Sequence, residues 1–190
     1  TGNLRLESYG QDLALHVLNS DGADRIEPLE IGDIAHRQIG THLSIPAKYY
    51  ERMRSEDPGL LAHNVNTWLE RTPAQRMIRV LDGKARAYLS NRYLRMDNYS
   101  IASAVLPILA EIPDVRIESC QITDSRMYIK AVNPRLQEDV TPGDTVQAGV
   151  VISNSEVGLG SVNIQPLIYR LVCSNGMVVN DAQTRRNHVG

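Results

Sequence analysis

The dipeptide Asp82-Gly83 constrains the fold more than any other feature of this sequence, because it separates two runs of alternating side chains. The runs cover residues 76–81 and 84–90. Asp-Gly is a favoured pair for a two-residue hairpin turn, in which both residues take positive φ angles. The sequence therefore predicts an antiparallel hairpin over residues 76–90 and a fold built on an antiparallel sheet.

The second half of the chain repeats this two-residue period. Alternating segments at about 115–123 and 126–132 flank the turn Asp124-Ser125. Two longer strands, at about 145–153 and 161–173, are expected on either side of the turn-rich residues 154–160. The polar stretch 133–144 contains two prolines and is expected to be a loop.

Helical periodicity occupies residues 30–72 and a second segment near residue 100. Pro46 opens a helix within the first section, and Thr72-Pro73 ends that section. Asp97-Asn98 is expected to cap a helix that runs to about Glu111.

These elements predict the α+β class. We expect an antiparallel β-meander sheet with helices packed on one face, plus a small N-terminal helical section. One or two short strands are also expected within residues 4–18. The expected division is 1–72 and 73–190, with a single compact domain as the alternative.

Charge is concentrated in one part of a chain whose net charge is only −2. A strongly basic whole domain, typical of nucleic-acid-binding proteins, is therefore absent. A local basic patch can still steer a polyanion. Residues 71–95 have a net charge of +6, with Asp82 as their one acidic side chain against the basic residues Arg71, Arg76, Arg79, Lys84, Arg86, Arg92 and Arg95.

The predicted hairpin registers place cations beside tyrosines on single sheet faces. In the first hairpin Arg79, Lys84, Arg86 and Tyr88 share a face, and in the second Arg126, Tyr128 and Lys130 do. Cations and exposed rings together form the platforms that bind single-stranded nucleic acid. The alternative is a solvated sheet face, because half-exposed strands commonly carry Arg, Lys, Thr and Tyr.

No residue pattern indicates catalysis, a cofactor or a metal. None of the five histidines pairs at the i, i+4 spacing of a helical metal site. Cys120 and Cys173 form no Cys-x-x-Cys pair and are expected to be buried strand cysteines. No apolar run is long enough to cross a membrane, and we expect a cytoplasmic protein that is not an enzyme.

Two segments resemble a known family. Residues 88–98 contain Arg92-Tyr93 followed by Asn98, and residues 153–176 contain a Ser-Glu turn followed by a strand ending Arg170-Leu-Val-Cys173-Ser-Asn175. Both resemble the phage/plasmid-like protein family, domain of unknown function 932. The glycine after the turn acid is displaced by one position here, since Val157 intervenes.

The resemblance covers roughly residues 40–190 and implies carriage on phages, plasmids or prophages, without an assured activity. The order of elements is also similar to Rad52-like single-strand annealing proteins, which is a likeness of fold alone. The signature positions that it implies are Arg92, Tyr93, Asn98, Arg170, Cys173, Asn175 and His188.

Two functions follow as hypotheses. The first is a non-catalytic module that binds or anneals single-stranded DNA, forms a homo-oligomer, and uses Arg79, Lys84, Arg86, Tyr88, Arg92, Tyr93, Arg126, Tyr128 and Lys130. The second is a phage or prophage accessory module that binds a host or phage protein and no nucleic acid. Its contacts would come from the helix around Tyr49-Tyr50 and from residues 145–173. A weaker third option is an enzyme site gathering His188, Arg170 and an acid.

Overall fold

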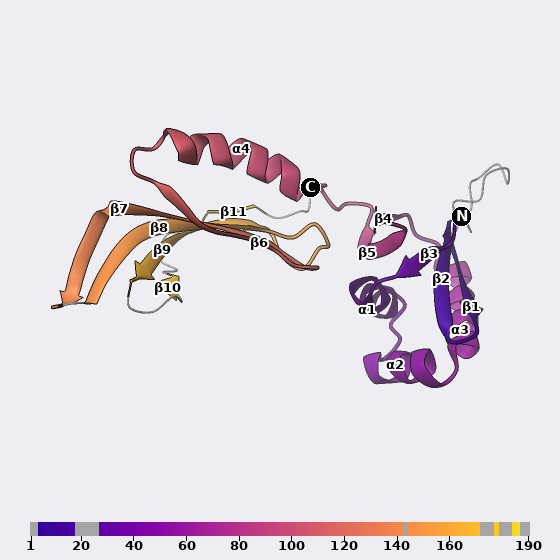
Figure 1. Ribbon diagram of the computed structural model, residues 1–190. Helices are drawn as coiled ribbons and strands as arrows, with labels where there is room; N and C mark the ends of the chain where they lie inside the picture. The colour runs from indigo at the N-terminus through magenta and orange to yellow at the C-terminus, as the bar shows by residue number, and fades with distance from the viewer. Residues whose placement is uncertain (1–3, 18–26, 143, 172–176, 179–183, 187–190) are drawn as a thin grey trace. The chain divides into compact units, whose positions relative to one another are not determined.

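The computed structural model describes residues 4–17, 27–142, 144–171, 177–178 and 184–186 (Figure 1). The chain divides into two compact units, Thr1–Arg92 and Tyr93–Gly190. The first unit therefore includes the Asp82-Gly83 hairpin, which we expected to belong with the later strands beyond residue 72.

Unit 1 contains a five-stranded sheet in the order β1-β2-β3-β5-β4. The strands are β1 (Leu4–Tyr9), β2 (Asp12–Val17), β3 (Leu29–Ile31), β4 (Arg76–Leu81) and β5 (Lys84–Ser90). The β3–β5 pair is parallel and the others are antiparallel. Because β1 and β4 end the order, each has one edge without a strand partner among the described residues.

Three helices complete unit 1: α1 (Asp33–His42), α2 (Ala47–Glu56) and α3 (Pro58–Arg71). Helix α1 packs on β5, and α3 packs on β1. Asp57 begins α3 by accepting a hydrogen bond from the backbone N–H of Leu60 at 2.9 Å. Strands and helices share one core around Leu6, Ile39 and Leu61. The N-terminal part thus combines helices with strands, and its sheet includes β3, β4 and β5 beyond the one or two strands expected within residues 4–18.

The β4–β5 hairpin turns where the sequence predicts it. Asp82 and Gly83 have φ angles of 49° and 72°. A bulge then interrupts the register between Val80 and Arg79, which pair with Ala85 and Ala87 respectively. Tyr88 lies opposite Ile78, not Met77, and the predicted sorting of faces is wrong beyond Arg86 because the bulge inserts one extra residue.

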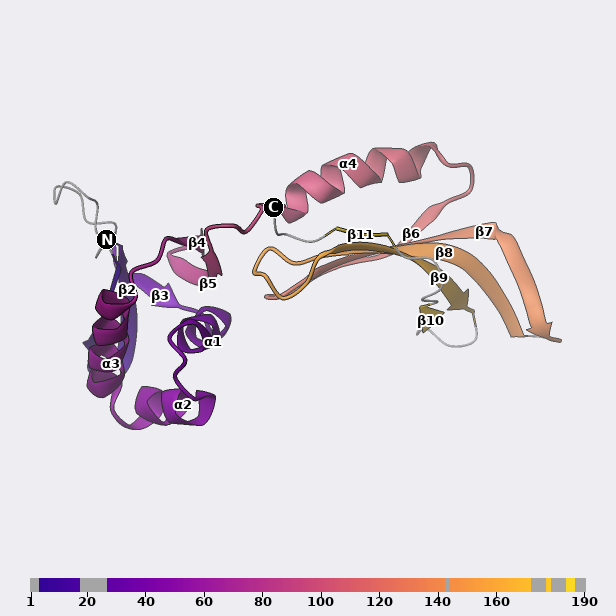
Figure 2. The same ribbon diagram turned by 180° about the vertical axis from the view of Figure 1, so that it is seen from behind.

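Unit 2 contains an antiparallel sheet in the order β10-β9-β8-β7-β6, with β11 also paired to β9. Its longest strands are β7 (Met127–Thr141) and β8 (Asp144–Asn154), followed by β9 (Val162–Arg170). The shorter strands are β6 (Arg116–Ile122), β10 (Met177–Val178) and β11 (Thr184–Arg186). Helix α4 (Asn98–Glu111) lies along one face of this sheet in both views (Figures 1 and 2).

The core of unit 2 lies between α4 and its sheet. Leu109 of α4 packs against a cluster that includes Met127, Ile129 and Ile152. Two expectations are corrected here. Most of the predicted loop 133–144 continues β7, since this stretch pairs with β8 despite its prolines. Cys120 is exposed, not buried, because β6 is an edge strand.

The two sheets, antiparallel except for the β3–β5 pair, and the helices packed on them confirm the α+β class. In the described part of the chain, no helix is long and apolar enough to cross a membrane.

Candidate functional site

The first predicted cation and tyrosine face is not an open stacking platform. Tyr88 is only 4% exposed. Its ring lies 5.6 Å from the ring of His42 and 5.6 Å from the guanidinium of Arg76. Burial raises the pKa of the Tyr88 hydroxyl. The backbone N–H of Tyr88 donates to Gln38 Oε1 at 2.7 Å. Tyr88 therefore belongs to the core of unit 1.

The cations around Tyr88 have protein partners. The Lys84 ammonium lies 2.5 Å from a carboxylate oxygen of Glu30. Arg79 and Arg86 are half-buried, and both interact with other groups of the chain. Arg92 is exposed at the end of unit 1, whereas the neighbouring Tyr93 is buried.

The second predicted face lies in unit 2, and some of its side chains also contact other residues of that unit. Arg126 donates from its guanidinium to the backbone carbonyl of Leu159 in the β8–β9 turn. Tyr128 packs beside a buried cluster that contains Val151 and Leu167, and Lys130 is half-buried. The nine predicted track residues thus fall in two units, and none of their three tyrosine rings is exposed.

The structure brings the two signature segments together inside unit 2. The Tyr93 hydroxyl donates to the backbone carbonyl of Ser155 at 2.9 Å. The Asn154 side-chain amide donates to Asn98 Oδ1 at 2.8 Å. The backbone N–H of Asn98 donates to Glu156 Oε1 at 2.6 Å. These contacts join the start of α4 to the β8–β9 turn, and they are structural.

The other signature residues are placed only in part. Arg170 pairs with Asp144, with 2.9 Å between Nε and Oδ1. Cys173, Asn175 and His188 lie outside the described residues. The site that combines His188 with Arg170 stays a prediction.

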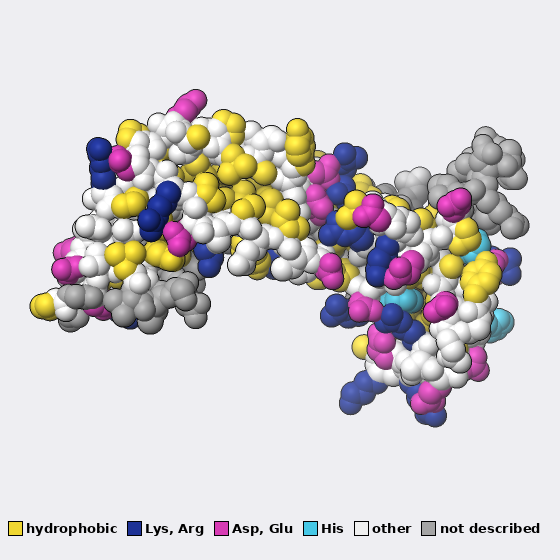
Figure 3. Space-filling view, in the orientation of Figure 1, with side chains coloured by type: hydrophobic (Ala, Val, Ile, Leu, Met, Phe, Trp, Pro, Cys, Tyr) yellow, Lys and Arg dark blue, Asp and Glu magenta, His cyan; other side chains and the backbone are white. Residues whose placement is uncertain are grey.

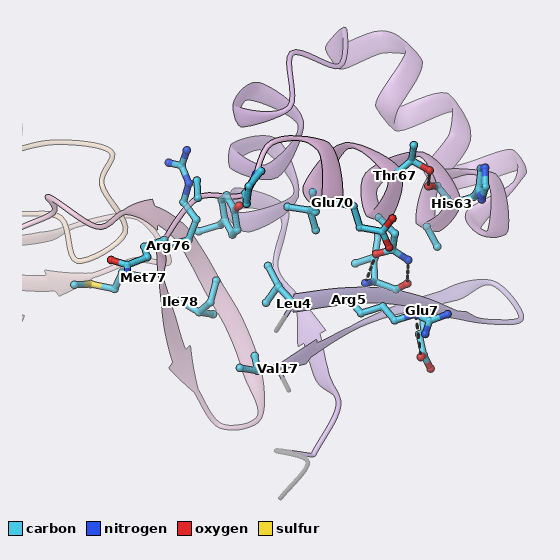
Figure 4. Close-up of a pocket in the computed structure, with 18 of the residues that line it drawn as sticks. Leu4, Arg5, Glu7, Val17, His63, Thr67, Glu70, Arg76, Met77 and Ile78 are labelled. Carbon is cyan, nitrogen blue, oxygen red and sulfur yellow. Dashed lines mark hydrogen bonds and ion pairs between the residues drawn. The ribbon is translucent and has the colours of Figure 1, made fainter. Parts of the chain in front are cut away.

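A cavity in unit 1, with a volume of about 1580 Å³, lies where β1, α3 and β4 meet (Figure 4). Residues Leu4–Ser8 and Gln75–Ile78 line it without a gap in either run. Alternate residues of a strand point to opposite faces, so a cavity on one face would touch every second residue. The consecutive lining residues indicate that the backbone of β1 and of β4 borders this cleft.

One side chain already occupies the β1 edge in this cleft. Asn66 of α3 donates from Nδ2 to the carbonyl of Leu6 at 2.8 Å, and its Oδ1 accepts from the N–H of Leu6 at 2.8 Å. A carboxamide that both donates to and accepts from one residue makes the contacts of a neighbouring strand's peptide group. Leu6 therefore directs its N–H and C=O away from β2 and into the cleft.

The floor of the cleft is apolar and its rim has mixed charge. Leu4, Val17 and Ile78 lie in the space between the two strands (Figure 4). The rim carries both signs of charge, from Arg5, Glu7, Glu70 and Arg76. Cationic and anionic side chains alternate over the visible face of unit 1 (Figure 3). Sequence reasoning missed this cleft because its two borders lie about 70 residues apart in the chain and each reads as an ordinary strand.

A second cavity in unit 1, of about 730 Å³, is lined by His36, Arg54 and several carboxylates. His36 Nδ1 lies 2.9 Å from the Tyr50 hydroxyl, and both residues are buried. Burial, with the nearby Arg54 charge, lowers the pKa of His36 to about 4. The imidazole is therefore neutral at neutral pH. Among the described residues, no three His, Cys, Asp or Glu side chains gather in a way that could hold a metal ion.

Comparisons with known proteins place the sequence in a family. No curated protein and no solved structure matches the chain. The family described as Domain of unknown function (DUF932) matches residues 87–190, which is more than half of the 190-residue chain. The match spans both signature segments and the contacts that join them, so the chain belongs to the domain of unknown function 932 family.

Proposed function

We propose that this chain is a non-catalytic protein-interaction module that binds an extended segment of another protein in the cleft of unit 1. The observation that carries the proposal is the contact between the cleft and two strand edges, β1 and β4, that have no strand partner among the described residues. An extended peptide that joins an open edge gains affinity from backbone hydrogen bonds and specificity from alternate side chains.

The chemistry of the cleft favours a peptide over a polyanion. Its floor offers apolar contacts at the half-buried Leu4, Val17 and Ile78. Its rim combines arginines with glutamates, and Arg5 lies 3.6 Å from Glu7. Binding to phosphate groups is favoured by a uniformly positive surface. A protein segment instead presents side chains of both charges together with apolar side chains.

Helix α4 supports a protein partner for unit 2 as well. No residue from Asn98 to Ala110 is charged. Tyr99 and Ile108 are nevertheless 82% and 61% exposed. Hydrophobic side chains gather around α4 and its sheet in Figure 3. A helix with an apolar outer surface is usually covered by another protein surface, and it offers no charge to a phosphate.

The second candidate is the binding or annealing of single-stranded DNA by a homo-oligomer. Its support is the net charge of +6 over residues 71–95 and the exposed position of Arg92. The buried Tyr88 and Tyr93 weaken it, because base stacking needs accessible rings. An origin in phages or plasmids, a cytoplasmic location and the Rad52-like relationship are part of the same proposal.

A library of random 12-residue peptides, selected on the immobilised full chain, tests the first function. Binding is then measured in solution by the fluorescence of Trp68, the single tryptophan, which lies on α3 beside the lining residues Thr67 and Leu69. A 30-nucleotide oligothymidylate is titrated in parallel at low and moderate salt. We expect selected peptides to bind and the oligonucleotide not to bind. The reverse result would replace the peptide function with the nucleic-acid one.

A backbone variant locates the binding site. Ser8 lies two residues from Leu6 on β1, so its N–H also points away from β2. Ser8→Pro removes this donor from the open edge without breaking a β1–β2 hydrogen bond. We expect Ser8→Pro to weaken peptide binding at least tenfold, and the matched control Ser8→Ala to bind like the wild type. Equal binding by both variants would exclude the β1 edge.

A further inference from the structure

The Asn66–Leu6 contact occupies the backbone groups of β1 that a bound strand would also use. Its two hydrogen bonds, each 2.8 Å long, join residues 60 positions apart. Strand β1 ends the sheet, so the N–H and C=O of Leu6 have no strand partner on this side. The Leu6 side chain is buried, and backbone polar groups at such a position need a partner. The Asn66 carboxamide supplies that partner.

The same contact interrupts the open edge. Leu4 and Ser8 lie two residues before and after Leu6, and their backbone groups share its orientation. Both residues line the cleft. A segment that pairs with Leu4 and Ser8 together must pass Leu6, where the Asn66 carboxamide lies.

We propose that Asn66 makes an autoinhibitory contact. It occupies the Leu6 backbone groups that a partner strand would bind, and it is displaced when such a strand binds β1. The inference rests on the proposed function, since it concerns the same cleft. Binding then replaces the two Asn66–Leu6 hydrogen bonds of the free protein with two hydrogen bonds between Leu6 and the partner strand. The net gain at Leu6 is therefore small, and affinity comes from the neighbouring positions and the apolar floor.

The register of β1 indicates which segments fit. Leu4 and Leu6 have side chains on the core side, and Arg5 and Glu7 alternate with them. A partner strand is expected to present an apolar side chain at every second position. Strand β2 already has this pattern, with Leu13, Leu15 and Val17 opposite Ser8, Leu6 and Leu4.

A synthetic peptide of residues 11–18 is therefore a defined probe. It carries the β2 sequence that already complements β1 in the folded chain. A fluorescent label on the peptide reports its binding to the full chain by anisotropy. The peptide is titrated against the wild type, Asn66→Ala and Asn64→Ala, all in the full chain. Asn64 lies on the same helix and donates to Met53 Sδ at 3.1 Å, so its loss removes a side-chain hydrogen bond without touching β1.

We expect Asn66→Ala to bind the peptide roughly tenfold more tightly than the wild type, because the competing pair of hydrogen bonds is gone. Asn64→Ala should bind like the wild type. Asn66→Asp keeps the acceptor for the Leu6 N–H but places a carboxylate against its carbonyl, so it should fall between wild type and Asn66→Ala. Asn66→Asp also provides the comparison if Asn66→Ala does not fold, as judged by far-ultraviolet circular dichroism.

The outcomes separate the two proposals. Equal or weaker peptide binding by a folded Asn66 variant overturns the autoinhibitory contact and leaves the cleft as a peptide site. Binding to neither wild type nor variant, together with no ligand from the peptide library, overturns the proposed function and this inference with it. If the Asn66 variants bind the peptide more tightly and Ser8→Pro abolishes this binding, the result supports both the proposed function and the autoinhibitory contact.

Discussion

The carboxylate of Glu156 accepts a hydrogen bond from the backbone N–H of Asn98 at 2.6 Å, and thereby caps a helix that begins 58 residues earlier in the chain. Asp97, which directly precedes α4, makes no side-chain cap bond. Its carboxylate instead accepts from Arg95 Nε at 2.7 Å. The β8–β9 turn thus supplies the negative charge that the start of α4 favours.

Glu156→Ala should lower the free energy of unfolding of unit 2 by about 1–2 kcal/mol, because it removes both the cap and a charge beside the helix dipole. Glu156→Gln should cost less, since its amide oxygen can still accept. Urea titration followed by circular dichroism measures both. Asp97→Ala is the matched control and should change stability by at most about 0.5 kcal/mol. A larger effect of Asp97→Ala than of Glu156→Ala would assign the cap to Asp97.

The hydroxyl of Tyr93 makes the second contact between the signature segments. Tyr93→Phe leaves the buried Ser155 carbonyl without the hydrogen bond that it accepts at 2.9 Å. We expect a loss of about 1–2 kcal/mol in the free energy of unfolding. Tyr99→Phe removes a hydroxyl from an exposed ring in the first turn of α4 and should be neutral. Comparable effects of the two variants in urea titration would contradict a structural role for Tyr93.

Local sequence signals predicted the turns and most of the elements. The Asp82-Gly83 turn, the α4 helix and the β6–β7 register around Asp124-Ser125 are confirmed. Each depends on residues within one turn or one helix, where backbone preference decides the outcome. The bulge at Arg86 was not predicted. Packing of Tyr88 against the core, and not the hairpin turn, determines on which face of the sheet Tyr88 lies.

The candidate site could not be predicted in this way. The cleft needs β1 and β4 at opposite ends of one sheet, and that order arises from the parallel β3–β5 pair. The Asn66–Leu6 contact likewise joins a helix to a strand that a sequence pattern treats separately. The resemblance identified Tyr93 and Asn98 as signature positions, but only the structure shows that they contact the β8–β9 turn.

Gly149 marks a close approach between β7 and β8. A Cβ atom at this position would lie 2.3 Å from the backbone oxygen of Ala131 and 3.1 Å from Cα of Val132. Backbone atoms in a central strand pair cannot move aside locally. Gly149→Ala should therefore destabilise unit 2 by about 1–3 kcal/mol or more.

The control for Gly149→Ala is Gly160→Ala. Its Cβ would meet the guanidinium of Arg126, the far end of a flexible side chain, at 2.6 Å. This side chain can swing away, so the loss in the free energy of unfolding should be smaller. A greater loss for Gly160→Ala would mean that the Arg126 contact with the turn, and not strand spacing, limits stability.

His36 predicts how the stability of unit 1 depends on pH. Burial and the nearby Arg54 lower its pKa from 6.5 to about 4 in the folded protein. Between these two pH values the unfolded chain binds a proton that the folded chain excludes. Stability should therefore decrease as pH falls from about 6.5 to about 4, by up to roughly 3 kcal/mol. The lowered pKa of His42 has the same sign.

Comparison with His36→Gln isolates this contribution, because His42 is present in both proteins. The variant should be less stable at neutral pH, since its side chain cannot reproduce the buried contact with Tyr50 at 2.9 Å. Its stability should nevertheless fall less steeply between pH 6.5 and pH 4. Urea titrations across this range measure both slopes, with His63→Gln, an exposed position on α3, as the control. Parallel slopes for the wild type and His36→Gln would show that His36 takes up its proton in the folded state.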